Sequence, residues 1–194
     1  MSVTRAFIAI SIPPSVQNKV EKIQDRLKQF RTPVRWVKPS NLHLTLKFLG
    51  NISEEQLEET KKCLSFSSQG IDSFTLRATE IGVFPNKSFP KVLWLGFYEP
   101  SGTLQKLVEN IENHLKQIGF KPENRKYAPH LTIGRIKPRK GKTEIFQMIK
   151  NEKSIFFDDI FVTCYHLIKS DLKPSGPEYS VLHTFNLKEA VKQF

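Results

Sequence analysis

The chain has 194 residues and carries 30 Lys and Arg against 19 Asp and Glu, which gives a formal net charge of +11. This length suits one domain with a sizeable core, no apolar run reaches the ~20 residues of a membrane helix, and the two cysteines suggest no disulfide framework. We therefore expect a cytoplasmic protein without membrane association, whose positive surplus favours polyanions such as RNA but fits a basic protein without that role equally well.

Strand-like and helix-like apolar spacings alternate along the chain. Ser53 and Gln56 form a capping box that opens the second helix, and Gly119 is placed to end the third. This order predicts an α+β fold with antiparallel β-sheets flanked by helices. In chain order, the spacings predict a strand over Arg5–Ile12, a helix over Val16–Phe30, a strand over Asn41–Leu49, a helix from Ser53 to about Leu64, strands over Phe74–Phe84 and Lys91–Phe97, a helix over Leu104–Ile118, a strand over His130–Ile136, a helix over Glu144–Lys150, and strands over Ile155–Ile168 and Tyr179–Leu187.

One short pattern occurs twice, at residues 42–47 and 130–135, and both copies lie on predicted strands. Successive side chains of a strand point to opposite faces, so His43 and Thr45 share one face of the first copy. His130 and Thr132 share one face of the second copy. The apolar residues between them suit a core, and two such strands could line one cleft from opposite sides.

Such a cleft suits the hydrolysis of a phosphate ester. One neutral imidazole can take a proton from water while a second, protonated imidazole gives a proton to the departing alkoxide. The hydroxyls of Thr45 and Thr132 can donate to the phosphate oxygens on which negative charge gathers. A single copy is more simply explained as a strand with a histidine at its edge, but the pair together favours catalysis by His43 and His130.

At these residues the chain resembles the 2H phosphoesterases, and within them the RNA 2′,3′-cyclic phosphodiesterase branch, historically called 2′-5′ RNA ligases. Val34–Gly50 is similar to the first motif region of that branch, and Tyr127–Arg135 is similar to the second. Gly82–Pro85 followed by Val92–Gly96 matches as well. The order of elements is similar over the whole chain, residues 1–194.

The resemblance implies a single bilobal domain in which two antiparallel sheets are related by a pseudo-two-fold axis. Each lobe would hold one motif, at residues 43–46 and 130–133, with the active-site cleft between the lobes. The implied reaction opens an RNA 2′,3′-cyclic phosphate to a 2′-phosphate and a free 3′-hydroxyl, without a cofactor. By motif order His43 would be the proton donor and His130 the acceptor, whereas the residues alone leave these roles open.

Four further residues are candidates for substrate binding. The resemblance places Arg135 at the catalytic phosphate, and Lys47 follows the first motif by the same logic. Tyr127 and Trp36 could stack on bases, although aromatic residues are more often part of a core. The cations after the second motif, Lys137, Arg139, Lys140 and Lys142, fit a patch along the RNA backbone or a solvated loop equally well.

Other motifs are weaker. Gly141-Lys142-Thr143 resembles the end of a nucleotide-binding loop, but Ile136 stands where the first glycine is required and Pro138 interrupts the loop. His114, His166 and His183 fit structural positions on their helix and strands. No group of residues has metal-ligand spacing, so we expect no metal.

Two alternatives stay open. The same acid and base can run in reverse and join a 2′,3′-cyclic phosphate to a 5′-hydroxyl, as a 2′-5′ RNA ligase would. The cleft could also bind RNA ends or nucleotides without catalysis. We expect a monomer whose partner is RNA with a 2′,3′-cyclic phosphate end, with tRNA fragments among the candidates.

Overall fold

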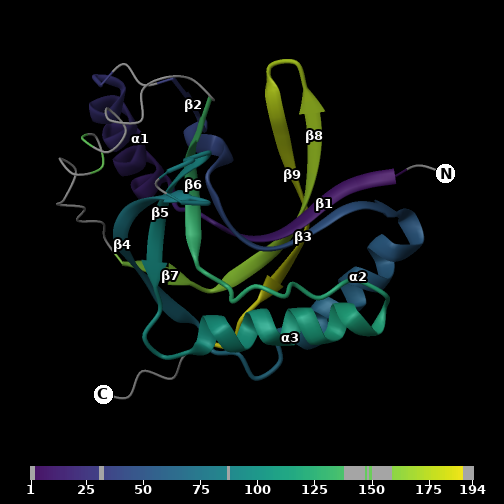
Figure 1. Ribbon diagram of the computed structural model, residues 1–194. Coiled ribbons are helices and arrows are strands. Elements are labelled where there is room, and N and C mark those ends of the chain that lie inside the picture. The colour runs from purple at the N-terminus through teal and green to yellow at the C-terminus, as the bar shows by residue number, and fades with distance from the viewer. Residues whose placement is uncertain are drawn as a thin grey trace.

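The computed structural model describes residues 3–30, 33–86, 88–137, 147, 149 and 159–189. These residues fold into helices and strands that confirm the expected α+β class (Figure 1). The elements in chain order are β1 (Val3–Ser11), α1 (Pro14–Lys28), β2 (Val34–Trp36), the 3-10 turn η1 (Pro39–Asn41), β3 (His43–Ser53), α2 (Glu54–Ser67), β4 (Phe74–Phe84), β5 (Val92–Tyr98), α3 (Thr103–Gln117), β6 (His130–Ile136), β7 (Ile160–Val162), β8 (Cys164–Lys173) and β9 (Gly176–Asn186).

The prediction of a single strand over Ile155–Ile168 is wrong for the part of it that the structure describes. It contains two strands, β7 and β8, which separate at Thr163. The apolar spacing runs through this break, but β7 pairs with β4 whereas β8 pairs with β1 and β9. Residues 155–158 and most of the helix predicted over Glu144–Lys150 lie outside the described residues.

The nine described strands form one curled antiparallel sheet with the order β7-β4-β5-β6-β3-β1-β8-β9, and β2 pairs with β6 (Figure 1). The two expected sheets are therefore joined. The join is narrow, because Leu44 of β3 and Leu131 of β6 form the one residue pair of that ladder. One half of the sheet ends in the strand with the first motif, and the other half ends in the strand with the second.

The helices cover the sheet with their apolar faces. The capping box of Ser53 and Gln56 opens α2 as predicted, and α2 and α3 pack side by side near β3 and β1 (Figure 1). Helix α1 reaches the other half, where the buried Gln24 side chain donates to the carbonyls of Val37 and Ile133 at 2.9 Å each. Leu44 and Leu131 are fully buried in this core, so the inward residues of both motifs hold the join together. In the part of the chain that the structure describes, no helix is long and apolar enough to cross a membrane.

Candidate active site

A cleft of about 460 Å³ opens where the two halves of the sheet meet. Both histidines and both threonines of the doubled motif line it, and so do Arg135 and Trp36. The structure thus brings together six of the eight residues that the sequence predicts for the site. Lys47 and Tyr127 lie elsewhere.

The pairing at the join explains how the motif residues come to face one cleft. Leu44 lies opposite Leu131 in an antiparallel ladder. Extending this register by one residue on each side sets His43 across from Thr132 and Thr45 across from His130. All four side chains then share the face opposite to the two leucines, and the histidines are diagonal neighbours, which lie roughly 7–8 Å apart at Cα.

Each imidazole is oriented by the carbonyl two residues before it. His43 Nδ1 lies 2.8 Å from the Asn41 oxygen, and His130 Nδ1 lies 2.8 Å from the Ala128 oxygen. A carbonyl oxygen only accepts, so Nδ1 carries the proton in both rings. Both Nε2 atoms are therefore left for proton exchange with a ligand.

Aromatic side chains support both rings. His43 lies 4.6 Å from the Phe7 ring and meets Tyr179 edge-on at 5.2 Å, and His130 meets Phe84 edge-on at 4.9 Å between centroids. Burial lowers the pKa of His43, and the positive charge of Arg135 lowers it further, against an opposing contribution from the bond to Asn41. His43 is therefore held toward its neutral form.

A β-bulge follows each motif at the same place. In β3, Thr45 pairs with Ala9 and Lys47 with Ile8, so Leu46 is an extra residue. In β6, Thr132 pairs with Trp94 and Gly134 with Leu93, so Ile133 is an extra residue. A bulge reverses the alternation of side chains beyond it. The burial patterns of the first six residues of β3 and β6 are accordingly identical, and each exposes the sixth residue, Phe48 or Arg135.

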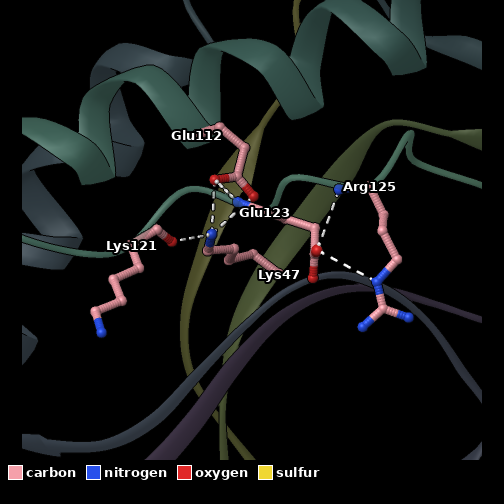
Figure 2. A network of polar contacts seen from close by, with 5 residues as sticks. All are labelled: Lys47, Glu112, Lys121, Glu123 and Arg125. Carbon is pink, nitrogen blue, oxygen red and sulfur yellow. Dashed lines mark hydrogen bonds and ion pairs between the residues drawn. The ribbon is translucent and has the colours of Figure 1, made fainter.

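This bulge corrects the prediction for Lys47. Counted from each histidine, the counterpart of Arg135 is Phe48, which lines the cleft, and the counterpart of Lys47 is the buried Gly134. Lys47 points away from the cleft, and its Nζ lies 2.8 and 2.6 Å from the two carboxylate oxygens of Glu112 (Figure 2). Strict alternation from Thr45 would place Lys47 in the cleft, and the extra residue Leu46 moves it to the other face.

Tyr127, which the sequence suggests as a base-stacking residue, is not among the residues that line the cleft. Its ring packs against the core, and its hydroxyl donates to the backbone oxygen of Thr45 at 3.0 Å. Burial raises the pKa of Tyr127, so the hydroxyl remains a donor. Trp36 is half-buried and does line the cleft.

Several residues line the cleft that the sequence does not identify as candidates. Arg5, Arg35 and Lys38 line it together with Arg135, and none of the described residues that line it is acidic. Phe48 and Tyr179 add aromatic surface, with 67% of Phe48 exposed. Arg35 and Lys38 flank Trp36 in the stretch similar to the first motif region, which was a usable signal. Arg5 and Tyr179 come from distant strands, and only the order of strands in the sheet shows their proximity.

The remaining predictions concern residues away from the cleft. His114 bonds the Asn110 oxygen and the Ser67 hydroxyl within its helix pair, as a structural residue does. His183, which also fits a structural position, is exposed on β9, and its ring lies 4.6 Å from that of Phe185. In the described ranges no three metal-ligating side chains gather. Arg139, Lys140 and the Gly141-Lys142-Thr143 segment lie outside those ranges.

Comparison with known proteins places the chain in a family. Residues 10–94 and 98–179 match a family model described as LigT like phosphoesterase. An RNA 2′,3′-cyclic phosphodiesterase of Methanothermobacter thermautotrophicus is 33% identical over 183 residues, which cover 94% of this chain and 98% of that protein. A protein of the same name from Methanocaldococcus jannaschii is 36% identical over 178 residues, with coverages of 92% and 98%.

Solved structures agree on the fold. The protein TT0787 of Thermus thermophilus superposes with a TM-score of 0.77 at 27% identity, covering 95% of this chain and 98% of that one. E. coli LigT complexed with 3′-AMP gives a TM-score of 0.72 at 23% identity, with coverages of 96% and 99%. At this identity the match is evidence for a shared fold only. The resemblance expected from the two motifs is therefore confirmed, and the chain belongs to the LigT-like phosphoesterase family.

Proposed function

We propose that the protein hydrolyses RNA 2′,3′-cyclic phosphate ends to a 2′-phosphomonoester and a free 3′-hydroxyl. The observation that supports this most directly is the pair of imidazoles on adjoining strands of one cleft, each with Nδ1 bonded to a backbone carbonyl. The names of the curated relatives agree with this substrate.

In the proposed reaction both histidines act through Nε2. His130 takes a proton from a water molecule that attacks the phosphorus atom opposite the 3′ oxygen. The P–O3′ bond breaks, and His43 gives its proton to that oxygen. One water is consumed, and the phosphate stays on the 2′ oxygen. Positioned acids and bases of this kind each contribute about 10²–10⁴-fold to a rate.

The rest of the cleft suits an RNA end. The hydroxyls of Thr45 and Thr132 can donate to the non-bridging oxygens, and Arg135 supplies positive charge beside His43. Arg5, Arg35 and Lys38 extend the positive lining of the cleft. Phe48 and Trp36 offer faces for unstacked bases of a single strand.

The assignment of donor and acceptor follows motif order and is part of the proposal. Burial and Arg135 favour neutral His43, whereas the donor must be protonated. An incoming phosphate anion offsets the charge of Arg135 and favours the protonated imidazole. Substrate binding would in this way charge the acid that the reaction needs.

An end-group assay tests the function. Purified protein is mixed with an RNA oligonucleotide ending in a 2′,3′-cyclic phosphate, in EDTA, and the product is compared with 2′- and 3′-phosphate standards. We expect the 2′-phosphate, and we expect His43→Ala and His130→Ala to lose about 10²–10⁴-fold or more in kcat.

His183→Ala is the matched control, because His183 is exposed on β9 and outside the cleft. It should keep wild-type activity. A 3′-phosphate product, full turnover by either catalytic variant, or activity that requires added divalent metal would refute the proposal. A parallel reaction with 5′-hydroxyl RNA detects the 2′-5′ linkage that the reverse reaction would produce.

A further inference from the structure

The segment between α3 and β6 has neither helix nor strand, yet it determines how His130 is held. Residues 118–129 lead directly into β6. Near the end of this segment, the Ala128 oxygen accepts the Nδ1 proton of His130 at 2.8 Å. A displacement of the segment would therefore move the carbonyl that orients the imidazole.

Two bonds tie this segment to β3, the strand of the first motif. Lys47 Nζ donates to the Lys121 oxygen at 2.8 Å, and the Tyr127 hydroxyl donates to the Thr45 oxygen at 3.0 Å. Thr45 and Lys47 are two residues apart on β3, on either side of the bulge. The strand that presents His43 to the cleft thus holds, through its other side, the segment that orients His130.

Glu112 of α3 completes the arrangement (Figure 2). Its two carboxylate oxygens lie 2.8 and 2.6 Å from Lys47 Nζ, and one of them accepts from the Glu123 backbone nitrogen at 3.2 Å. The Lys47 side chain is only 9% exposed and that of Glu112 18%. An ion pair this buried fixes the positions of its partners but adds little net stability, because the cost of desolvation offsets most of the attraction.

We propose that Lys47, Glu112 and Tyr127 form a loop clamp, a set of positioning residues that fixes His130 relative to His43. The proposal rests on the proposed function. The sheet itself provides a single residue pair between β3 and β6, so it constrains the two motif strands weakly. The clamp adds connections between the same two strands by way of the segment 118–129.

Tyr127→Phe removes one hydroxyl and tests the clamp. The matched control is Tyr165→Phe, because the Tyr165 hydroxyl also donates to a backbone oxygen, that of Leu64 at 2.6 Å, far from the cleft. We expect kcat on the cyclic-phosphate oligonucleotide to fall about tenfold in Tyr127→Phe, since small misplacements of reacting groups are costly, with KM nearly unchanged. Tyr165→Phe should lose stability but keep kcat.

A second readout does not require turnover. Nitrogen NMR of the imidazoles reports which ring nitrogen of His130 carries the proton. We expect Nδ1–H in the wild type and in Tyr165→Phe, and a mixture of tautomers in Tyr127→Phe. The double variant Lys47→Met/Glu112→Gln leaves no unpaired charge and should show the same mixture.

The outcomes separate the two proposals. A wild-type protein without hydrolysis refutes the proposed function, while the tautomer of His130 still tests the clamp. Equal losses of kcat in the two tyrosine variants, or His130 signals that stay unchanged in Tyr127→Phe and in the double variant, would overturn the clamp.

Discussion

Each motif histidine is held by a carbonyl two residues before it, so the tautomer of the ring is set by local backbone. His43 differs from a solvated imidazole because burial and Arg135 favour its neutral form. The folded protein therefore binds this proton less readily than the unfolded chain does. Between the folded pKa and 6.5, His43 adds stability as pH rises, and that contribution is lost as pH falls.

Arg135→Gln should raise the pKa of His43, because it removes a positive charge that disfavours the imidazolium. The pKa should stay below 6.5, since burial is the larger cause and remains. An NMR titration of His43 measures this. Arg77→Gln, which changes an exposed arginine of β4 paired with Asp159, should leave the titration unchanged. An unchanged pKa in Arg135→Gln would contradict the attribution to Arg135.

At this scale the sequence predicts which motif side chains face the cleft better than it predicts the contacts of their neighbours. His43, Thr45, His130 and Thr132 are evident because a doubled alternating pattern constrains the face of each residue. The prediction that Lys47 lies in the cleft fails because of the β-bulge at Leu46. An extra apolar residue in an apolar strand cannot be recognised from the sequence. The position of Tyr127 outside the cleft lining could not be predicted, because its partner, the Thr45 oxygen, is a backbone atom far away in the chain.

At one place in the sheet, the close packing of two neighbouring strands depends on a glycine. A Cβ added at Gly82 of β4 would lie 2.1 Å from the Trp94 ring of β5. Trp94 in turn lies 5.0 Å from the Phe84 ring, which meets His130 edge-on. Gly82 thus allows an aromatic stack that ends on a motif histidine.

Gly82→Ala should destabilise the protein by about 1–3 kcal/mol, because the methyl group displaces Trp94 from a tightly packed position. Its kcat should also fall, since Phe84 and His130 move with Trp94. Chemical denaturation and the end-group assay measure the two effects. Gly82→Ala combined with Trp94→Leu should regain stability, and a single variant as stable as the wild type would refute this packing argument.

Most elements follow from apolar spacing, and the capped start of α2 agrees to the residue. The strand predicted over Ile155–Ile168 shows where spacing is insufficient. Its break at Thr163 comes from a change of pairing partner, and a partner strand far away in the chain is not encoded in local spacing. The three-residue β2 is too short to have a period.

For the whole molecule, the net charge follows directly from the sequence, but its distribution over the surface does not. The chain carries a net charge of +11, and four of its cations, Arg5, Arg35, Lys38 and Arg135, meet at the cleft. Their convergence depends on the order of the strands in the sheet, which the sequence did not provide.

KM for a cyclic-phosphate oligonucleotide should rise with KCl concentration, because binding releases counterions from each contacted phosphate. The logarithmic slope should approach ~0.7 per contact for a single strand. A 2′,3′-cyclic mononucleotide is the matched substrate, with one phosphate and a smaller slope. Equal slopes for both substrates would show that the additional cations contact no RNA.

The single Leu44–Leu131 pair has a mechanical consequence. Two blocks that meet at one bridge can pivot about it without breaking any other ladder bond between β3 and β6. A pivot of this kind would change the width of the gap between the imidazoles. The bonds of Lys47 and Tyr127 across the same join oppose it.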